Sequence, residues 1–168
     1  MRRLVALGLV VLAGCDFGGD GKTIDEARVD ELVLQRSDMP PGLRPAYVRT
    51  VSGRAVSTVR FSRTGTALSI ESSVNVLDSR DAAEERLDAE RDAVDRKPDW
   101  LPIDEPGLGD ESFAATVRQA GLRRYEVFWR EHNAAASLKV EDFEGRMALA
   151  DVLALARKQE QRIADAAD

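Results

Sequence analysis

The sequence predicts an α+β domain: a mainly antiparallel sheet of about five strands with helices packed on one face, in the order α-β-β-α-β-β-β-α. Two observations support this prediction. Several segments alternate apolar and polar residues, as half-buried strands do, and turns of hairpin length join most of them. Other segments have apolar residues at helical spacing. The chain has 168 residues, which suits a single domain with its own core.

The first fifteen residues have the organisation of a secretory signal. Arg2 and Arg3 precede an apolar run from Leu4 to Gly14. As a helix, this run would cover only about 16 Å at ~1.5 Å per residue, whereas the hydrocarbon core of a bilayer is about 30 Å thick. We therefore expect residues 1–14 to be a signal peptide and not a transmembrane helix.

The end of this run, Leu12-Ala13-Gly14-Cys15, resembles the lipobox of bacterial lipoproteins. The resemblance implies that cleavage makes Cys15 the first residue and that Cys15 carries acyl chains. Two or more chains, at about 0.8 kcal/mol per buried methylene, anchor a protein stably to a bilayer. The expected location is the outer leaflet of the cytoplasmic membrane, with the domain extracytoplasmic, or the outer membrane in a Gram-negative host.

Removal of the signal peptide leaves 154 residues, with 22 basic and 30 acidic side chains and a net charge of −8. Residues 15–23 contain the lipidated cysteine and three glycines and predict a flexible tether; residues 24–168 form the single domain. The acidic balance argues against nucleic acid as a partner. Because Cys15 is the only cysteine, the domain has no disulfide and depends on packing. We expect a monomer.

The first half of the domain predicts a helix followed by a hairpin. Residues 25–35 have a ragged apolar stripe and acids in the first turn, which favours a helix ending before Pro40. Residues 51–62 are a candidate strand, and Arg63-Thr64-Gly65 is a turn. Residues 67–77 are the clearest strand, with apolar residues on one face and polar residues on the other.

The second half predicts a helix, a loop, a meander and a last helix. Ser79 suits the N-cap of a helix over 80–96, and residues 98–109 form a loop with three prolines. Asparagine in the turn His132-Asn133 tolerates the left-handed backbone of a tight hairpin. Residues 146–164 are the strongest helix. The three strands of the meander are expected at 113–119, 123–131 and 134–143.

The sequence contains no catalytic constellation. His132 is the only histidine, so counting residues excludes the usual zinc sites. Residues 16–23 end like a phosphate-binding loop, but Asp16 occupies the position of its first glycine. Four acidic residues lie in or next to the predicted loop: Asp104, Glu105, Asp110 and Glu111. Acidic residues of a loop are most often simply solvated, although a cation site or an acid–base pair is an alternative. We expect the protein to have no enzymatic activity and to bind no cofactor and no metal.

Trp100, Trp129 and Arg130 are the candidate ligand-binding residues. An exported domain with few aromatic residues could place Trp100, Tyr47 and Trp129 around a cleft between sheet and helices, although core packing is the commoner fate of such aromatic side chains. Arg130 directly follows Trp129 and could hold an anion in such a cleft. The sequence therefore predicts a small-ligand site near these three side chains.

Three short segments of the domain resemble small exported bacterial domains, among them the extracytoplasmic sensor domains of receptor serine/threonine kinases. They are Asp38-Met39-Pro40-Pro41-Gly42, Val127-Phe128-Trp129-Arg130 followed by Asn133, and Leu155-Ala156 with Arg162-Ile163. The resemblance implies a non-catalytic binding or sensing module, attached to the membrane through the lipid on Cys15. Two alternatives remain open: an accessory subunit that docks on an envelope protein complex, and a carboxylate-based envelope hydrolase.

Overall fold

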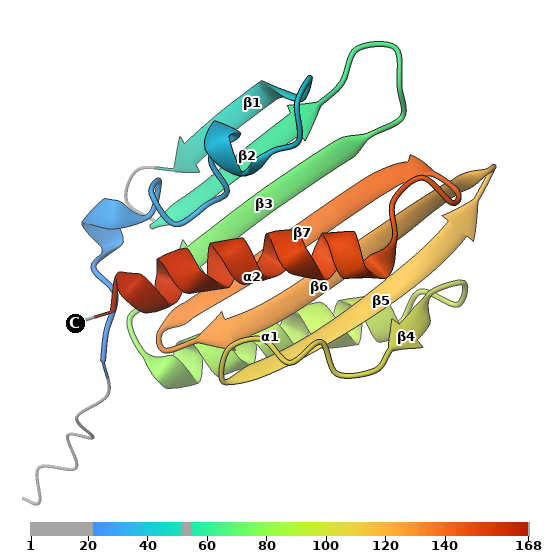
Figure 1. The fold of residues 1–168 in the computed structure, drawn as a ribbon. Coiled ribbons are helices and arrows are strands. Elements are labelled where there is room, and N and C mark those ends of the chain that lie inside the picture. Colours follow the sequence, from blue (N-terminus) through green and yellow to red (C-terminus); the bar gives the residue numbers. More distant parts are fainter. Residues whose placement is uncertain (1–21, 52–54, 168) are drawn as a thin grey trace, which may run out of the picture.

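The structure, a computed structural model, describes residues 22–51 and 55–167; the predicted signal peptide, the lipobox and Cys15 lie outside this part. Within it, seven antiparallel strands form one sheet in the order β1-β2-β3-β7-β6-β5-β4 (Figure 1). The strands are β1 (Arg44–Val51), β2 (Val56–Ser62), β3 (Ser69–Val76), β4 (Leu101–Ile103), β5 (Glu111–Gln119), β6 (Leu122–Glu131) and β7 (Ala134–Phe143). The helices are α1 (Arg80–Asp95) and α2 (Leu149–Asp165).

The predicted α+β class and antiparallel sheet are confirmed, but the expected five strands are seven. The two edge strands β1 and β4 were not predicted. Residues 44–50 of β1 are all exposed, so they have no alternation of buried and exposed positions from which a strand can be recognised. β4 has only three residues and lies inside the predicted proline-rich loop. The single strand predicted over residues 51–62 contains the last residue of β1 and all of β2, so the prediction merged parts of two strands.

The predicted helix over residues 25–35 is wrong. The segment holds only a short 3-10 helix, η1 (Glu26–Arg28), and a second one, η2 (Arg36–Asp38), follows it. Leu32, Val33 and Leu34 are all buried, and three consecutive residues cannot point to one face of a helix. The N–H of Leu34 instead donates to the hydroxyl of Ser72 on β3, which holds this irregular segment against the sheet.

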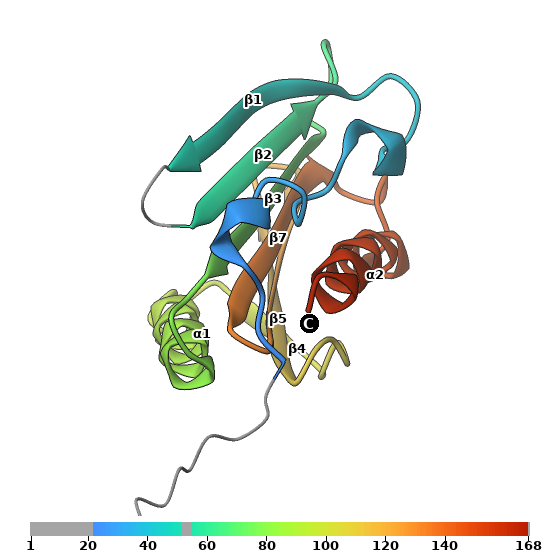
Figure 2. The same ribbon diagram turned by 90° about the vertical axis from the view of Figure 1, so that its left-hand side faces the viewer.

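The helices cover opposite faces of the sheet, not the single face that the sequence predicted (Figure 2). On β6, Val127 and Trp129 belong to the larger core, which includes residues of α2, whereas Phe128 packs with Leu87 of α1. Successive strand residues point to opposite faces, and the residues of β6 from Tyr125 to Arg130 are buried on both. We call the two sides of the sheet the α1 face and the α2 face.

Both ends of the described chain meet at one end of the sheet. Asn133, in the β6–β7 turn, accepts the N–H of Ile24 at 2.8 Å and donates to the carbonyl of Leu77 at 2.8 Å. Ile24 also forms a β-bridge with Ala167. The turn itself was predicted, but the residue with positive φ is His132, at 53°, and not Asn133. Asn133 instead fixes the point where the chain enters the domain.

Candidate functional site

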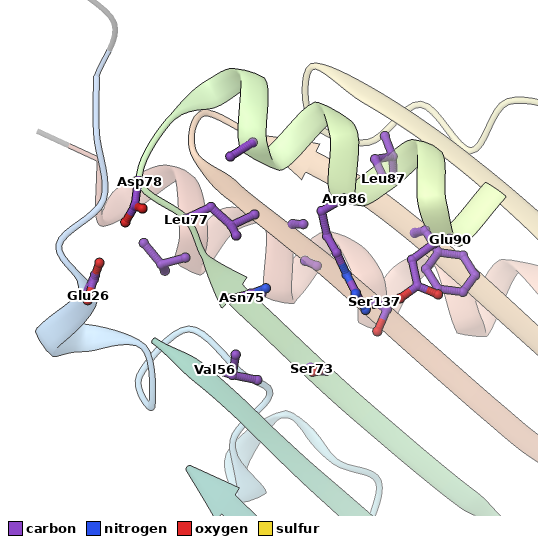
Figure 3. Close-up of a pocket in the computed structure, with 15 residues that line it drawn as sticks. Glu26, Val56, Ser73, Asn75, Leu77, Asp78, Arg86, Leu87, Glu90 and Ser137 are labelled. Atoms are coloured by element: carbon purple, nitrogen blue, oxygen red, sulfur yellow. Dashed lines mark hydrogen bonds and ion pairs between the residues drawn. The ribbon is translucent and has the colours of Figure 1, made fainter. Parts of the chain in front are cut away.

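The candidate site is a groove of about 530 Å³ between α1 and the sheet, here called the α1 groove (Figure 3). Its floor comes from β3 and β7 and its wall from α1. Figure 3 shows side chains from these elements, from β2 and from η1 around one space. The residues that line it are Glu26, Val56, Ser73, Asn75, Val76, Leu77, Asp78, Ala82, Arg86, Leu87, Glu90, Phe128, Ala135, Ala136 and Ser137.

The groove exists because the sheet is wider than the helix that covers it. α1 lies over β6 and β7, where Phe128 stacks on Phe113 with ring centroids 4.7 Å apart. Beyond the helix, the α1 face of β3 stays open and carries the polar residues of the strand, among them Ser73 and Asn75. Pairing of Ser73 with Ser137 then brings β7 into the same floor.

The floor offers hydrogen-bonding groups that the fold does not use. The hydroxyl of Ser73 is occupied, since it lies 2.8 Å from the hydroxyl of Thr58 and donates to a backbone carbonyl. The side chains of Asn75 and Ser137 make no hydrogen bond with any other described residue. An amide and a hydroxyl together provide both donors and acceptors. They are therefore available to a bound molecule.

The walls combine apolar and charged side chains. Arg86 and Glu90, one helical turn apart on α1, pair with each other, and Arg86 reaches over the floor toward Ser137 (Figure 3). Glu26 and Asp78 add two further carboxylates, so acids outnumber bases among the lining residues. The groove therefore disfavours anions. Apolar side chains cover part of the surface: Val56, Leu77, Leu87 and Phe128.

A second groove, of about 640 Å³, lies between α2, residues 37–40 and the β2–β3 turn. Its main charged groups already have partners within the protein. Asp38 pairs with Arg162 at 3.0 Å, Lys158 donates to the carbonyl of Asp38, and Arg63 donates to the carbonyl of Pro41. These contacts hold the chain around η2 against α2 and the β2–β3 turn. The α1 groove has the larger share of free polar groups, so it is the better candidate.

The structure does not bring the three predicted ligand-binding residues to one cavity, and none of them lines the α1 groove. Trp129 is fully buried in the core on the α2 face. Arg130 is buried on the opposite face of the strand, where it pairs with Asp110 at 2.6 Å. Trp100 lies near the end of α1 beside a cavity of about 260 Å³, with the ammonium of Lys97 4.5 Å from its ring centroid.

The four loop carboxylates do not converge either. Asp110 pairs with Arg130, and Glu111 pairs with Arg91 at 2.7 Å. Asp104 and Glu105 are exposed. In the described ranges, no group of three or more histidine, cysteine, aspartate or glutamate residues is arranged to hold a metal ion. Two of the four carboxylates are therefore held by arginines, and the other two are exposed.

Among the described residues, Glu131 is the one carboxyl with a clear pKa shift. It ends β6, and its Oε1 lies 3.4 Å from Nε2 of His132. Burial raises the pKa of Glu131 above its ordinary value, and the carboxylates of Asp110 and Glu160 raise it further, whereas His132 and Arg130 lower it. The folded protein consequently holds a proton on Glu131 more tightly than the unfolded chain does.

This shift predicts a pH-dependent stability. The stability contributed by Glu131 is fully present below its unfolded-state pKa and is lost as the pH rises through its folded-state pKa. We expect Glu131→Gln, which cannot ionise, to raise the free energy of unfolding at neutral pH and to leave it nearly unchanged in acid. Urea unfolding at a series of pH values measures this. Glu105→Gln, at an exposed position, is the matched control and should change neither value; a Glu131→Gln protein less stable than wild type at neutral pH contradicts the prediction.

A scan against protein-family models finds no match for the chain, and a search of curated proteins finds none either. Among solved structures, the extracellular domain of PknH from Mycobacterium tuberculosis is similar, with a TM-score of 0.66 and 11% sequence identity; the match covers 86% of this chain and 99% of that one. The two chains share a fold. The likeness to sensor domains of receptor kinases that the sequence predicted is confirmed at this level, which is that of the fold alone.

Proposed function

We propose that this chain is an extracytoplasmic binding or sensing module that takes a small, neutral, polar ligand in the α1 groove. The main observation in support is a groove of about 530 Å³ whose floor presents the unpartnered side chains of Asn75 and Ser137 beside an apolar wall. Ligand sites typically have volumes of about 300–1,000 Å³, with few polar groups set among apolar ones. The fold shared with an extracellular domain supports an exported setting.

The lining chemistry favours a ligand that carries hydroxyl groups, such as a monosaccharide or disaccharide. Asn75 and Ser137 can each donate and accept, which suits hydroxyls, and Arg86 and Glu90 add one charged donor and one charged acceptor at the rim. The apolar residues can pack against the C–H surface of a sugar ring. The excess of carboxylates around the groove disfavours a phosphorylated or carboxylated ligand.

Attachment to a membrane through lipid on Cys15 belongs to the same proposal. Among the described residues, no helix is long and apolar enough to cross a membrane. Asn133 and Ala167 fix Ile24 at one end of the sheet. Most of the tether predicted for residues 15–23 lies outside the described residues; a flexible chain of this length spans about 15 Å. The domain would then lie close to the bilayer with this end toward it.

The proposal is tested by adding neutral monosaccharides and disaccharides to the isotopically labelled mature chain with Cys15→Ser and recording amide NMR shifts. We expect shifts at Asn75, Ser137 and α1, and weaker or no shifts with sugar phosphates. Asn75→Ala combined with Ser137→Ala should weaken binding about tenfold, since each hydrogen bond contributes about 0.5–1.5 kcal/mol. Shifts that cluster in the second groove, around Met39 and Met147, contradict the proposal.

Ser69→Ala is the matched control for the double variant. Ser69 lies on the same strand and the same face as Ser73 and Asn75, but it does not line the α1 groove. Sugar binding to the Ser69→Ala protein should equal that of wild type. An equal loss of affinity in this control shows that the effect is not local to the groove and counts against the assignment.

A further inference from the structure

The two edges of the sheet differ in their capacity to bind another strand. β4 has three residues with Pro102 in the middle, and proline lacks the N–H that a strand ladder needs. β1 has eight residues, pairs with β2 on one side and leaves its backbone groups free on the other. Figures 1 and 2 show β1 at the margin of the sheet, beyond both helices. Of the two edge strands in the described part of the chain, β1 is therefore the one with a long open edge.

Most of β1 is regular as well as exposed. An irregularity in its register with β2 lies between Pro45 and Tyr47, and from Tyr47 to Val51 the pairing is continuous. The two large apolar side chains of this run are exposed, Tyr47 by 41% and Val48 by 63%. Aromatic and β-branched residues favour strand pairing. Pro45 and the irregularity therefore disrupt strand pairing only at the start of β1, and the five residues from Tyr47 to Val51 remain able to pair.

The register places the charges of β1 on one face. Arg44, Tyr47 and Arg49 lie opposite Ser62, Arg60 and Thr58 of β2, so all three residues belong to the α1 face. Val48 lies opposite Val59 and belongs to the α2 face. Arg44 and Arg49 form no ion pair with any described residue. β1 therefore has two unpartnered cations on one side and an exposed apolar residue on the other.

The charge around β1 is opposite to that of the rest of the chain. Residues 39–70 contain five arginines and no aspartate or glutamate, whereas the chain as a whole has a net charge of −6. The remaining residues consequently have a net charge of −11. Pairing of β1 with β1 of a second copy would bring like charges together, which is unfavourable across strands. An acidic partner would meet complementary charge instead.

We propose that β1 is a docking edge that takes up an extended, acidic segment of a partner protein as an eighth strand. The segment would present carboxylates on the α1 face, near Arg44 and Arg49, and an apolar side chain near Val48 on the other. Backbone hydrogen bonds supply affinity in this mode of recognition, and side chains supply specificity. This interaction surface is separate from the α1 groove and does not depend on the ligand proposed there.

A synthetic peptide that alternates glutamate with valine and threonine tests the proposal on the labelled mature chain with Cys15→Ser. Amide shifts and slowed hydrogen exchange should appear at Tyr47 to Val51, and binding should weaken with added salt. Two control peptides keep the protein unchanged: one with lysine in place of glutamate, and one with N-methylated backbone at alternate residues. Both control peptides should bind about tenfold more weakly or worse. The lysine peptide loses the complementary charge, and the N-methylated peptide cannot form the backbone hydrogen bonds of a strand pair.

On the protein side, Arg44→Gln combined with Arg49→Gln should weaken binding of the acidic peptide about three- to tenfold, as two exposed charge pairs would. Arg118→Gln combined with Arg123→Gln, on the opposite side of the sheet, should leave it unchanged. Equal binding of all three peptides, shifts outside β1, or no binding at all would overturn the proposal. Slowed exchange at β1 without peptide, together with a dimer in sedimentation, would also overturn it, because the occupant would be a second copy.

Discussion

Replacement of Cys15 by serine is expected to abolish acylation and to prevent processing by the lipoprotein route. The wild-type protein should lose residues 1–14, gain the mass of its acyl chains and require detergent for extraction from membranes. Serine has no sulfur to acylate, so the variant should show none of these three changes. An acidic chain is repelled by an anionic leaflet, so the domain itself should add no membrane affinity. Intact-mass analysis and membrane fractionation measure both effects.

Asp16→Asn is the matched control for this variant. It alters the residue next to Cys15 but keeps the thiol, so acylation and cleavage should match those of wild type. Globomycin, which blocks lipoprotein signal cleavage, should cause the uncleaved wild-type chain to accumulate. A wild-type protein that keeps Met1, carries no fatty acid and fractionates with the cytosol would contradict the lipoprotein interpretation.

Trp129→Ala is expected to cost about 3–5 kcal/mol of unfolding free energy, which is typical of deleting a buried aromatic side chain. Trp129 has 0% exposure in the core on the α2 face, so the cavity left behind cannot be filled by solvent without exposing apolar neighbours. Domains are stable by only about 5–15 kcal/mol, so the loss is a large part of the total. Urea unfolding followed by circular dichroism measures it.

Trp129→Phe separates the effect of volume from that of the indole N–H. Within the described residues, Nε1 of Trp129 is buried without a hydrogen-bond partner. Phenylalanine removes this unsatisfied donor, which offsets part of the cost of the smaller ring, so Trp129→Phe should be clearly milder than Trp129→Ala. Trp100→Ala, at a half-buried position, should also be milder. Equal destabilisation by all three changes would contradict the burial of Trp129.

The elements that are best predicted from the sequence are those whose buried residues recur at a single spacing, either that of a strand or that of a helix. The β5–β6–β7 meander and both long helices were predicted because each has an apolar face. β1 has no buried face, and residues 32–34 are buried in succession, so neither pattern could indicate the right structure. The placement of helices on both faces was signalled by Phe128, which is apolar and lies opposite the apolar set of Val127 and Trp129.

The site was harder to predict than the fold. The polar face of β3 was recognised, but Ser73 and Ser137 are brought together by pairing of strands that are far apart in the sequence. No local pattern shows that this face extends beyond α1 and forms a groove. The alternation of β6 did place Trp129 on the same face as Tyr125 and Val127, and both of those residues are buried. This alternation therefore indicates that Trp129 belongs to the core.

The meeting of the two chain ends beside Asn133 affects how the protein can be labelled. Ala167 lies next to Ile24, so a fluorescent protein fused after the last residue would begin at the same end as the lipid tether. In a chain anchored at Cys15 it would be crowded against the headgroups and could hold the domain away from the bilayer. The β2–β3 turn at Thr64 and Gly65, at the opposite end of the sheet, is the better insertion point for a reporter.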